Sequence, residues 1–80
     1  MTIGEAVAVR IGELCKEHGI TLNKLSTICG ITQSTLNNIA NGTSKNPTIS
    51  TIKKVCDGLN MNIIEFFDAD VFRCLEQEVR

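Results

Sequence analysis

The sequence predicts an all-α protein, and three observations support this prediction. Apolar residues recur every three or four positions in five successive segments, which is the spacing of one face of an α-helix. Residues that cap helices, such as Thr, Asn and Gly, separate these segments. No stretch of useful length alternates apolar and polar residues as a half-buried strand does. Eighty residues with 42% apolar content are enough for one domain with one core.

The first helix is predicted over residues 4–18. Val7, Ile11 and Leu14 recur at helical spacing and form one apolar stripe. The charged residues of this segment fall mostly off that stripe, as expected for a helix with one buried face. Gly19 follows directly and is a natural C-terminal stop.

The second helix is expected to begin after Thr21, a favourable N-cap residue. Gly30 follows the helix and suits the left-handed conformation of a tight turn. Ile31 is expected to be buried in that turn. The residues expected on the apolar face of this helix are Leu22, Leu25, Ile28 and Cys29.

The third helix is expected to follow Thr32 as its N-cap and to end at Asn41-Gly42. Leu36 and Ile39 point inward at helical spacing. The remaining side chains of this helix are therefore on its outer face, and they are polar. They include Gln33, Ser34, Asn37 and Asn38.

A polar loop over residues 43–47 contains the only proline and precedes a fourth helix, which Thr48 caps. A fifth helix starts at Asn62, with Glu65 three residues later as a variant of the capping box. The core-facing residues expected in these two helices are Ile49, Ile52, Val55, Cys56, Leu59, Ile63, Phe66 and Phe67.

An apolar stripe resumes at helical spacing beyond Asp68, and it predicts a sixth, amphipathic helix. We therefore expect a domain over residues 1–68 and a C-terminal helical tail over residues 69–80. Two roles for the stripe remain open, because it would either close the core or meet a second copy of the chain. The stripe consists of Val71, Phe72, Leu75 and Val79.

The distribution of charge is more informative than the net charge of −1. Residues 18–56 contain no Asp or Glu, whereas the acidic residues gather from Glu65 onward. The middle of the chain is therefore basic and the tail acidic. The lysines of the acid-free span are Lys24, Lys45, Lys53 and Lys54.

The four cysteines are not spaced as a disulfide framework or a metal site. There is no C-x-x-C pair, and the only histidine, His18, has no cysteine at ligand spacing. Cys29 and Cys56 fall at apolar positions, so we expect reduced, buried thiols and no metal or cofactor. No nucleophile with a base and an orienting acid is recognisable, which excludes the common enzyme classes. Neither a signal peptide nor a spanning apolar run is present, so we expect a cytoplasmic protein that does not enter a membrane.

The second and third segments meet the requirements of a helix-turn-helix over about residues 21–41. Ser26 supplies a small residue where the two helices cross, and Gly30 supplies the turn. The outer face of the second element is polar, with side chains that both donate and accept hydrogen bonds. The inward set is apolar and consists of Leu25, Cys29, Ile31, Leu36 and Ile39.

At this point the chain resembles the Cro/repressor family of bacterial and phage helix-turn-helix regulators, also called the XRE family. The resemblance covers about residues 7–67. Its signs are HGIT-x-x-x-L, GIT-Q-S-T-L, I-A-N-G, NP-T-I-S-T-I-K-K and LNMNIIEFF. It implies a compact five-helix, lambda-repressor-like DNA-binding domain whose third helix enters the DNA major groove.

The resemblance also assigns the residues of the DNA site. Base reading falls on one edge of the third helix, and phosphate contact falls on the starts of the second and third helices and on the following loop. The expected base readers are Gln33, Ser34 and Asn38, with Asn37 at the margin. The expected phosphate contacts are Thr21, Asn23, Lys24, Thr32, Thr35, Thr43, Ser44 and Lys45.

We therefore expect a sequence-specific transcriptional regulator, a repressor that binds double-stranded DNA as a homodimer on a palindromic site. The alternative is a protein-interaction module or antitoxin with the same fold. Its partner would then be a protein bound through the acidic, amphipathic tail. Salt-dependent binding of random duplex DNA distinguishes the two, because DNA binding weakens steeply with salt.

Overall fold

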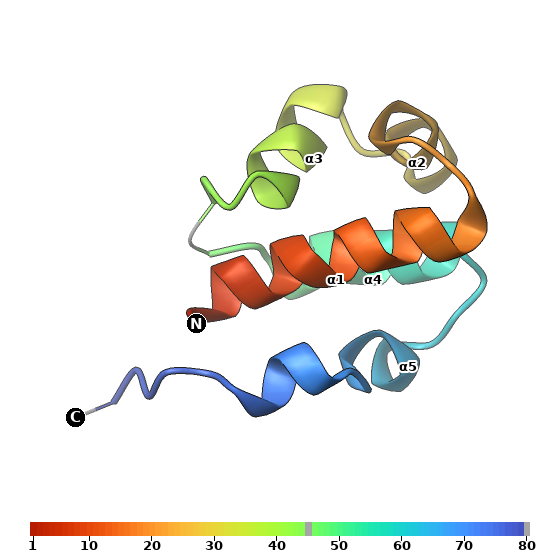
Figure 1. Ribbon diagram of the computed structural model, residues 1–80. Helices are drawn as coiled ribbons and strands as arrows, with labels where there is room; N and C mark the ends of the chain where they lie inside the picture. The colour runs from red at the N-terminus through yellow and green to blue at the C-terminus, as the bar shows by residue number, and fades with distance from the viewer. Residues whose placement is uncertain (45, 80) are drawn as a thin grey trace.

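A computed structural model describes residues 1–44 and 46–79, and in this part of the chain it contains five α-helices and one short 3-10 helix (Figure 1). The five predicted helices are confirmed, and the first starts one residue earlier than expected. Their bounds are α1 Ile3–His18, α2 Leu22–Cys29, α3 Gln33–Ala40, α4 Ile49–Gly58 and α5 Ile63–Phe67, followed by the 3-10 helix η1 Asp70–Arg73.

The long helix α1 is the centre of the arrangement (Figure 1). It packs against α3 on one side and against η1 on the other, while α2 packs against both α3 and α4. Its start is fixed by a capping box, in which Thr2 and Glu5 each accept a hydrogen bond from the other's backbone N–H. Its end is fixed by Gly19, which has the predicted left-handed conformation with φ 62°. One helix therefore contacts both an element from the middle of the chain and one near its carboxyl end.

One contiguous core joins all five α-helices. Its fully buried side chains are Phe66, Ile11, Leu14, Leu25, Leu36, Val7, Val55 and Cys56. Ile31 is half-buried and packs against the edge of this core, so its predicted burial is confirmed only in part.

Two residues predicted in the core are exposed instead. Ile28 is 40% exposed, because the buried face of α2 is centred on Leu25 and Cys29 and Ile28 lies at its edge. Ile49 is 63% exposed, because it is the first residue of α4 and the core begins one turn later, at Ile52.

The prediction of a sixth, amphipathic helix is wrong beyond a single 3-10 turn. Phe72 packs against the core and against the rings of Phe66 and Phe67, with centroids 6.0 and 4.8 Å away. No α-helix follows among the described residues, which end at Val79, and Val79 itself is 80% exposed. A short isolated helix is marginal in water, and only the first turn of this segment finds a packing partner. The first part of the stripe therefore closes the core, and the rest does not form a helical surface.

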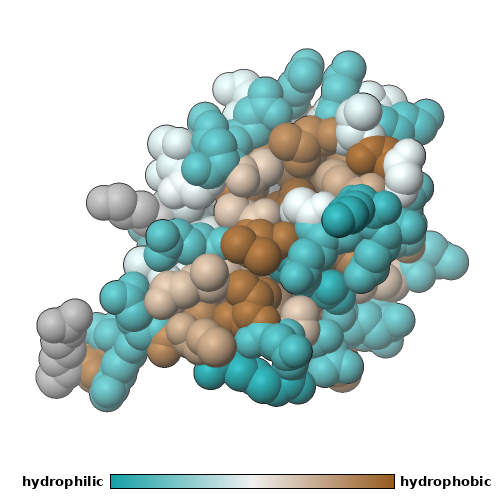
Figure 2. Space-filling model, in the orientation of Figure 1, coloured by the Kyte–Doolittle hydropathy of each residue, from teal (hydrophilic) through white to brown (hydrophobic). Residues whose placement is uncertain are grey.

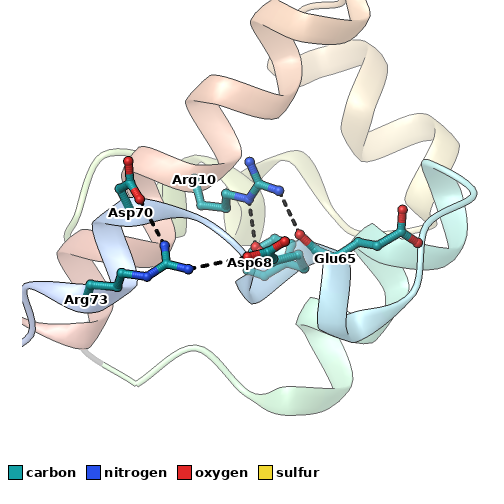
Figure 3. A network of polar contacts seen from close by, with 6 residues as sticks. Arg10, Glu65, Asp68, Asp70 and Arg73 are labelled. Atoms are coloured by element: carbon teal, nitrogen blue, oxygen red, sulfur yellow. Dashed lines mark hydrogen bonds and ion pairs between the residues drawn. The ribbon is translucent and has the colours of Figure 1, made fainter.

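A buried guanidinium ties α1 to α5. Arg10 is 9% exposed, and its Nε donates to the Phe66 carbonyl at 2.6 Å while Nη2 donates to the Glu65 carbonyl at 2.8 Å (Figure 3). Its Nη1 also lies 3.6 Å from the Glu13 carboxylate. The last carbonyls of a helix have no partner inside the helix, and a cation is favourable at that end. Arg10 thus acts as a side-chain cap for α5.

The buried cysteines are small apolar side chains where the helices pack together. Cys15, Cys29 and Cys56 are buried on α1, α2 and α4, which confirms the prediction for these three, whereas Cys74 is exposed. Burial raises the pKa of Cys29 to about 11, so this thiol is neutral at physiological pH. Helices α2 and α4 approach each other closely at Gly58, where an added Cβ would lie 2.6 Å from the Cys29 sulfur.

Replacing Arg10 with Met should lower the free energy of unfolding by roughly 2–4 kcal/mol, because two buried carbonyls lose their charged donor. Urea denaturation of the wild type and the variant measures this difference. Glu13→Gln is the control, and it should cost less than ~1 kcal/mol because Glu13 is exposed. Equal effects of the two substitutions would contradict the assigned role of Arg10.

Gly58→Ala should destabilise the protein by roughly 1–3 kcal/mol, because the new methyl group collides with Cys29. Gly12→Ala on α1 is the matched control, since nothing lies within 4 Å of its Cβ position. That control should be neutral or stabilising by up to ~1 kcal/mol. A double-mutant cycle with Cys29→Ala should show part of the Gly58→Ala cost removed, and additive effects would argue against the contact.

Candidate nucleic-acid interface

The α2–α3 turn has the geometry that the sequence pattern predicts. Gly30 is left-handed with φ 67°, and the N–H groups of Gly30 and Ile31 both donate to the Ser26 carbonyl. Ser26 is buried at the crossing, and its hydroxyl donates to the Asn23 carbonyl at 2.7 Å. The hydroxyl is therefore satisfied within its own helix, and a serine fits at this crossing without a partner from α3.

The outer face of α3 is polar and open to solvent. Leu36 is fully buried and Ile39 nearly so, which fixes the rotation of the helix. The four predicted base readers are all exposed on the remaining surface, and they are Gln33, Ser34, Asn37 and Asn38. The structure therefore brings these four residues together on one short helix.

The start of α2 presents the first group of predicted phosphate contacts. Thr21, Asn23 and Lys24 are exposed there. The Thr21 hydroxyl accepts a hydrogen bond from the Lys24 N–H at 3.1 Å and so caps the helix. The Asn23 and Lys24 side chains remain free to reach outward.

The loop after α3 is tied back to the helix by two hydrogen bonds. The Thr43 N–H donates to the Asn41 side-chain oxygen at 3.0 Å, and the Ser44 N–H donates to the Asn38 carbonyl at 3.0 Å. Thr43 is exposed and Ser44 half-buried. The third residue predicted in this loop, Lys45, lies outside the described residues.

A polar groove runs between α3, this loop and the start of α4. The sequence prediction included part of its lining but missed Asn46, Thr48 and Thr51. The sequence pattern that indicates Thr48 and Thr51 is a repeated Thr-x-x-Thr, which occurs at residues 32–35 and again at residues 48–51. The groove is lined by Thr35, Asn38, Ile39, Thr43, Ser44, Asn46, Pro47, Thr48 and Thr51.

The five helix starts fall into two electrostatic kinds. At α1 and α5 a glutamate occupies the third helical position and completes a capping box, through Glu5 and Glu65. The first turns of α2, α3 and α4 contain no acidic residue. A helix start carries a partial positive charge, which a nearby carboxylate offsets. This charge is therefore uncompensated at α2, α3 and α4.

At α3 and α4 the glutamate is replaced by threonine. The Thr35 N–H donates to the Thr32 hydroxyl at 3.2 Å, and that hydroxyl donates to the Thr35 hydroxyl at 2.8 Å. The same pair of bonds joins Thr48 and Thr51, at 3.1 and 2.9 Å. The helix starts are thus capped without added negative charge, and anions are favourable there.

Other kinds of site are not seen in the described part of the chain. Residues 1–44 and 46–79 contain no group of three or more His, Cys, Asp or Glu side chains that could hold a metal ion. No helix within these residues is long and apolar enough to cross a membrane.

Two solved structures resemble this fold. The crystal structure of the prophage Lp1 protein 11 superposes with a TM-score of 0.78 at 42% sequence identity, covering 86% of this chain and 91% of that one. An HTH_3 family transcriptional regulator from Vibrio cholerae superposes with a TM-score of 0.77 at 29% identity, covering 85% of this chain and 38% of that one.

Sequence comparisons agree with the structural ones. The HTH-type transcriptional regulator SlrR of Bacillus subtilis is 34% identical over 55 residues, which are 69% of this chain and 36% of SlrR. The chain thus spans about a third of the length of that relative. The family model of the Cro/C1-type HTH DNA-binding domain matches residues 10–70. With most of its length matched, and with the helices and turn of that motif in place, the chain belongs to the Cro/C1-type helix-turn-helix family of DNA-binding domains.

Proposed function

We propose that this domain binds double-stranded DNA sequence-specifically, with α3 in the major groove, and that it represses transcription. One observation supports this most directly. The exposed polar edge of α3 lies beside helix starts that are capped but carry no acid. This combination suits base reading flanked by phosphate contacts.

The proposed base readers differ in what they can recognise. Gln33, the first residue of α3, has an amide long enough to bind an adenine edge through two hydrogen bonds. Asn38 lies further along the same edge and has the same chemistry with a shorter reach. Ser34 and Asn37 lie between these two on the face of the helix, and their hydroxyl and amide groups serve either base edges or phosphate.

Phosphate contact is proposed at three places around that edge. The start of α2 supplies Thr21, Asn23 and Lys24, and the loop after α3 supplies Thr43, Ser44 and Lys45. The third place is the groove between α3 and α4. There the Thr35 and Thr51 hydroxyls each accept a hydrogen bond from the capping threonine, so their own protons are free to be donated to a phosphate oxygen.

A domain of this size makes few base contacts, so we propose that two copies bind a two-fold symmetric operator. The half-sites would then lie about one helical turn apart, ~34 Å. Repression would follow if the operator overlaps a promoter.

In-vitro selection of bound sequences from a random duplex pool tests the function. We expect enrichment of a palindromic site, together with affinity that falls steeply with salt. If the domain does not bind duplex DNA even at low salt, the function is wrong and the protein-interaction alternative is favoured.

Gln33→Ala should reduce discrimination between the selected site and its variants by ~1–3 kcal/mol, because it removes a base contact. Lys24→Gln should instead weaken all sequences about equally and lower the salt dependence. Competition binding with the selected site and a scrambled one measures both effects. If Gln33→Ala weakens the two DNA molecules equally, the reading edge has been placed wrongly.

Thr35→Glu and Thr51→Glu should separate stability from DNA binding. A glutamate at these positions completes a charged capping box, so stability should stay equal or rise by ~0.3–1 kcal/mol. DNA affinity at low salt should fall by on the order of tenfold, because the carboxylate repels phosphate. Thermal unfolding and DNA titration of the same samples measure the two quantities.

Glu65→Thr at the start of α5 is the converse control. The substitution replaces a charged capping box with a neutral cap. The change is made on α5, which α1 and α4 separate from α3 (Figure 1). Stability should fall slightly and DNA affinity should hardly change. If Thr51→Glu leaves DNA affinity unchanged, the start of α4 does not face phosphate.

A further inference from the structure

The last described residues run alongside the N-terminus. We call residues 74–79 the carboxyl-terminal arm. The Glu76 N–H donates to the Met1 carbonyl at 2.9 Å, and the Met1 nitrogen donates to the Cys74 carbonyl at 3.4 Å. The N-terminus and the blue carboxyl-terminal arm lie on the same side of the molecule (Figure 1). The arm is therefore attached through main-chain bonds, although it has no regular secondary structure.

This attachment brings the acidic end of the arm toward the DNA-facing loop. Glu78 lines one cavity together with Glu5, Gly42 and Asn46, so it shares a surface with both ends of the α3–α4 loop. Glu76 and Glu78 line a second hollow beside Thr2. The loop itself belongs to the acid-free span 18–56. The arm thus adds carboxylates at the border of this loop, where the Glu5 carboxylate of α1 also lies.

The other acids that follow α5 are arranged differently. Asp68 and Asp70 both lie next to Arg73, with nitrogen–oxygen distances of 3.5 and 2.9 Å (Figure 3). Their charge is therefore offset locally, on η1 and the residues before it. Glu76 of the arm has a longer contact of this kind, 4.0 Å from the Met1 ammonium, and this ion pair also holds the arm to the N-terminus. Residues 74–79 of the arm are all exposed. In the view of Figure 2, apolar side chains cross the middle of the molecular surface and hydrophilic ones surround them.

We propose that the carboxyl-terminal arm is a built-in electrostatic brake on DNA binding. This inference rests on the proposed function. When the arm is attached to Met1, Glu78 and Glu76 repel the phosphates that approach the α3–α4 loop. Detachment of the arm lets these charges move away, and affinity for DNA rises without any change in the base-reading edge.

Glu76→Gln/Glu78→Gln in the full chain tests the brake, with a random-sequence duplex as the probe. Both substitutions preserve shape and change the net charge from −1 to +1, since two acids are removed. We expect affinity at low salt to rise roughly three- to tenfold, and the gain to shrink with salt because exposed charges are screened. Asp68→Asn/Asp70→Asn makes the same change in net charge at a different place and should raise affinity far less.

Attachment is tested separately by comparing Glu76→Pro with Glu76→Gln. Both remove the same charge, but only proline removes the N–H that bonds to Met1. Glu76→Pro should bind the duplex more tightly than Glu76→Gln, because Glu78 is then free to move. Amide exchange of the arm reports whether it has detached.

The outcomes separate the two proposals. If the wild type binds the duplex and both double variants gain equally, only net charge matters and the brake is wrong. If the wild type binds and neither double variant gains, the brake is also wrong while DNA binding stands. If neither the wild type nor any variant binds duplex DNA at low salt, the proposed function fails and the brake fails with it.

Discussion

The Arg10 side chain is the interaction on which the arrangement of the helices depends. A five-residue helix has almost no stability of its own, and α5 carries the fully buried Phe66. The buried Phe66 carbonyl accepts a hydrogen bond from Arg10 Nε, and the Glu65 carbonyl accepts one from Arg10 Nη2 as well as one from the Asp68 N–H. The same α1 supports α3 on its other side. A single buried guanidinium therefore ties α5 to α1, the helix that packs against α3.

The second organising constraint is electrostatic and concerns how the helices begin. All five starts have a side-chain cap, which gives the N–H of the third helical residue a partner. Glutamates complete the caps of α1 and α5, while the starts of α2, α3 and α4, around the proposed DNA surface, have neutral caps. The protein thereby gains helix stability everywhere but keeps positive potential only where phosphate would approach.

This division explains how a chain of net charge −1 can present a surface for a polyanion. The acids occur in α1, at the end of α4, in α5 and in the segment after it, and the acid-free span contains α2, α3 and the loop that follows them. The start of α1 and the carboxyl-terminal arm are the exceptions, because Glu5 and the Glu78 of the attached arm both line a cavity at the edge of that loop. Affinity for DNA would then depend on a local contact rather than on net charge.

The sequence by itself determined the five helices, their threonine and asparagine caps, the Gly30 turn and the exposed polar edge of α3. These features follow from local rules of periodicity and capping, which the neighbouring residues decide. Only the tertiary structure decided that Ile28 and Ile49 are exposed, because the edge of a buried face depends on which helix covers it. It also decided that the last stripe stops after Phe72, and that Arg10 is buried and bonded to residues more than fifty positions away. The groove at the start of α4 also depends on the tertiary structure, since its lining comes from three segments that only folding brings together.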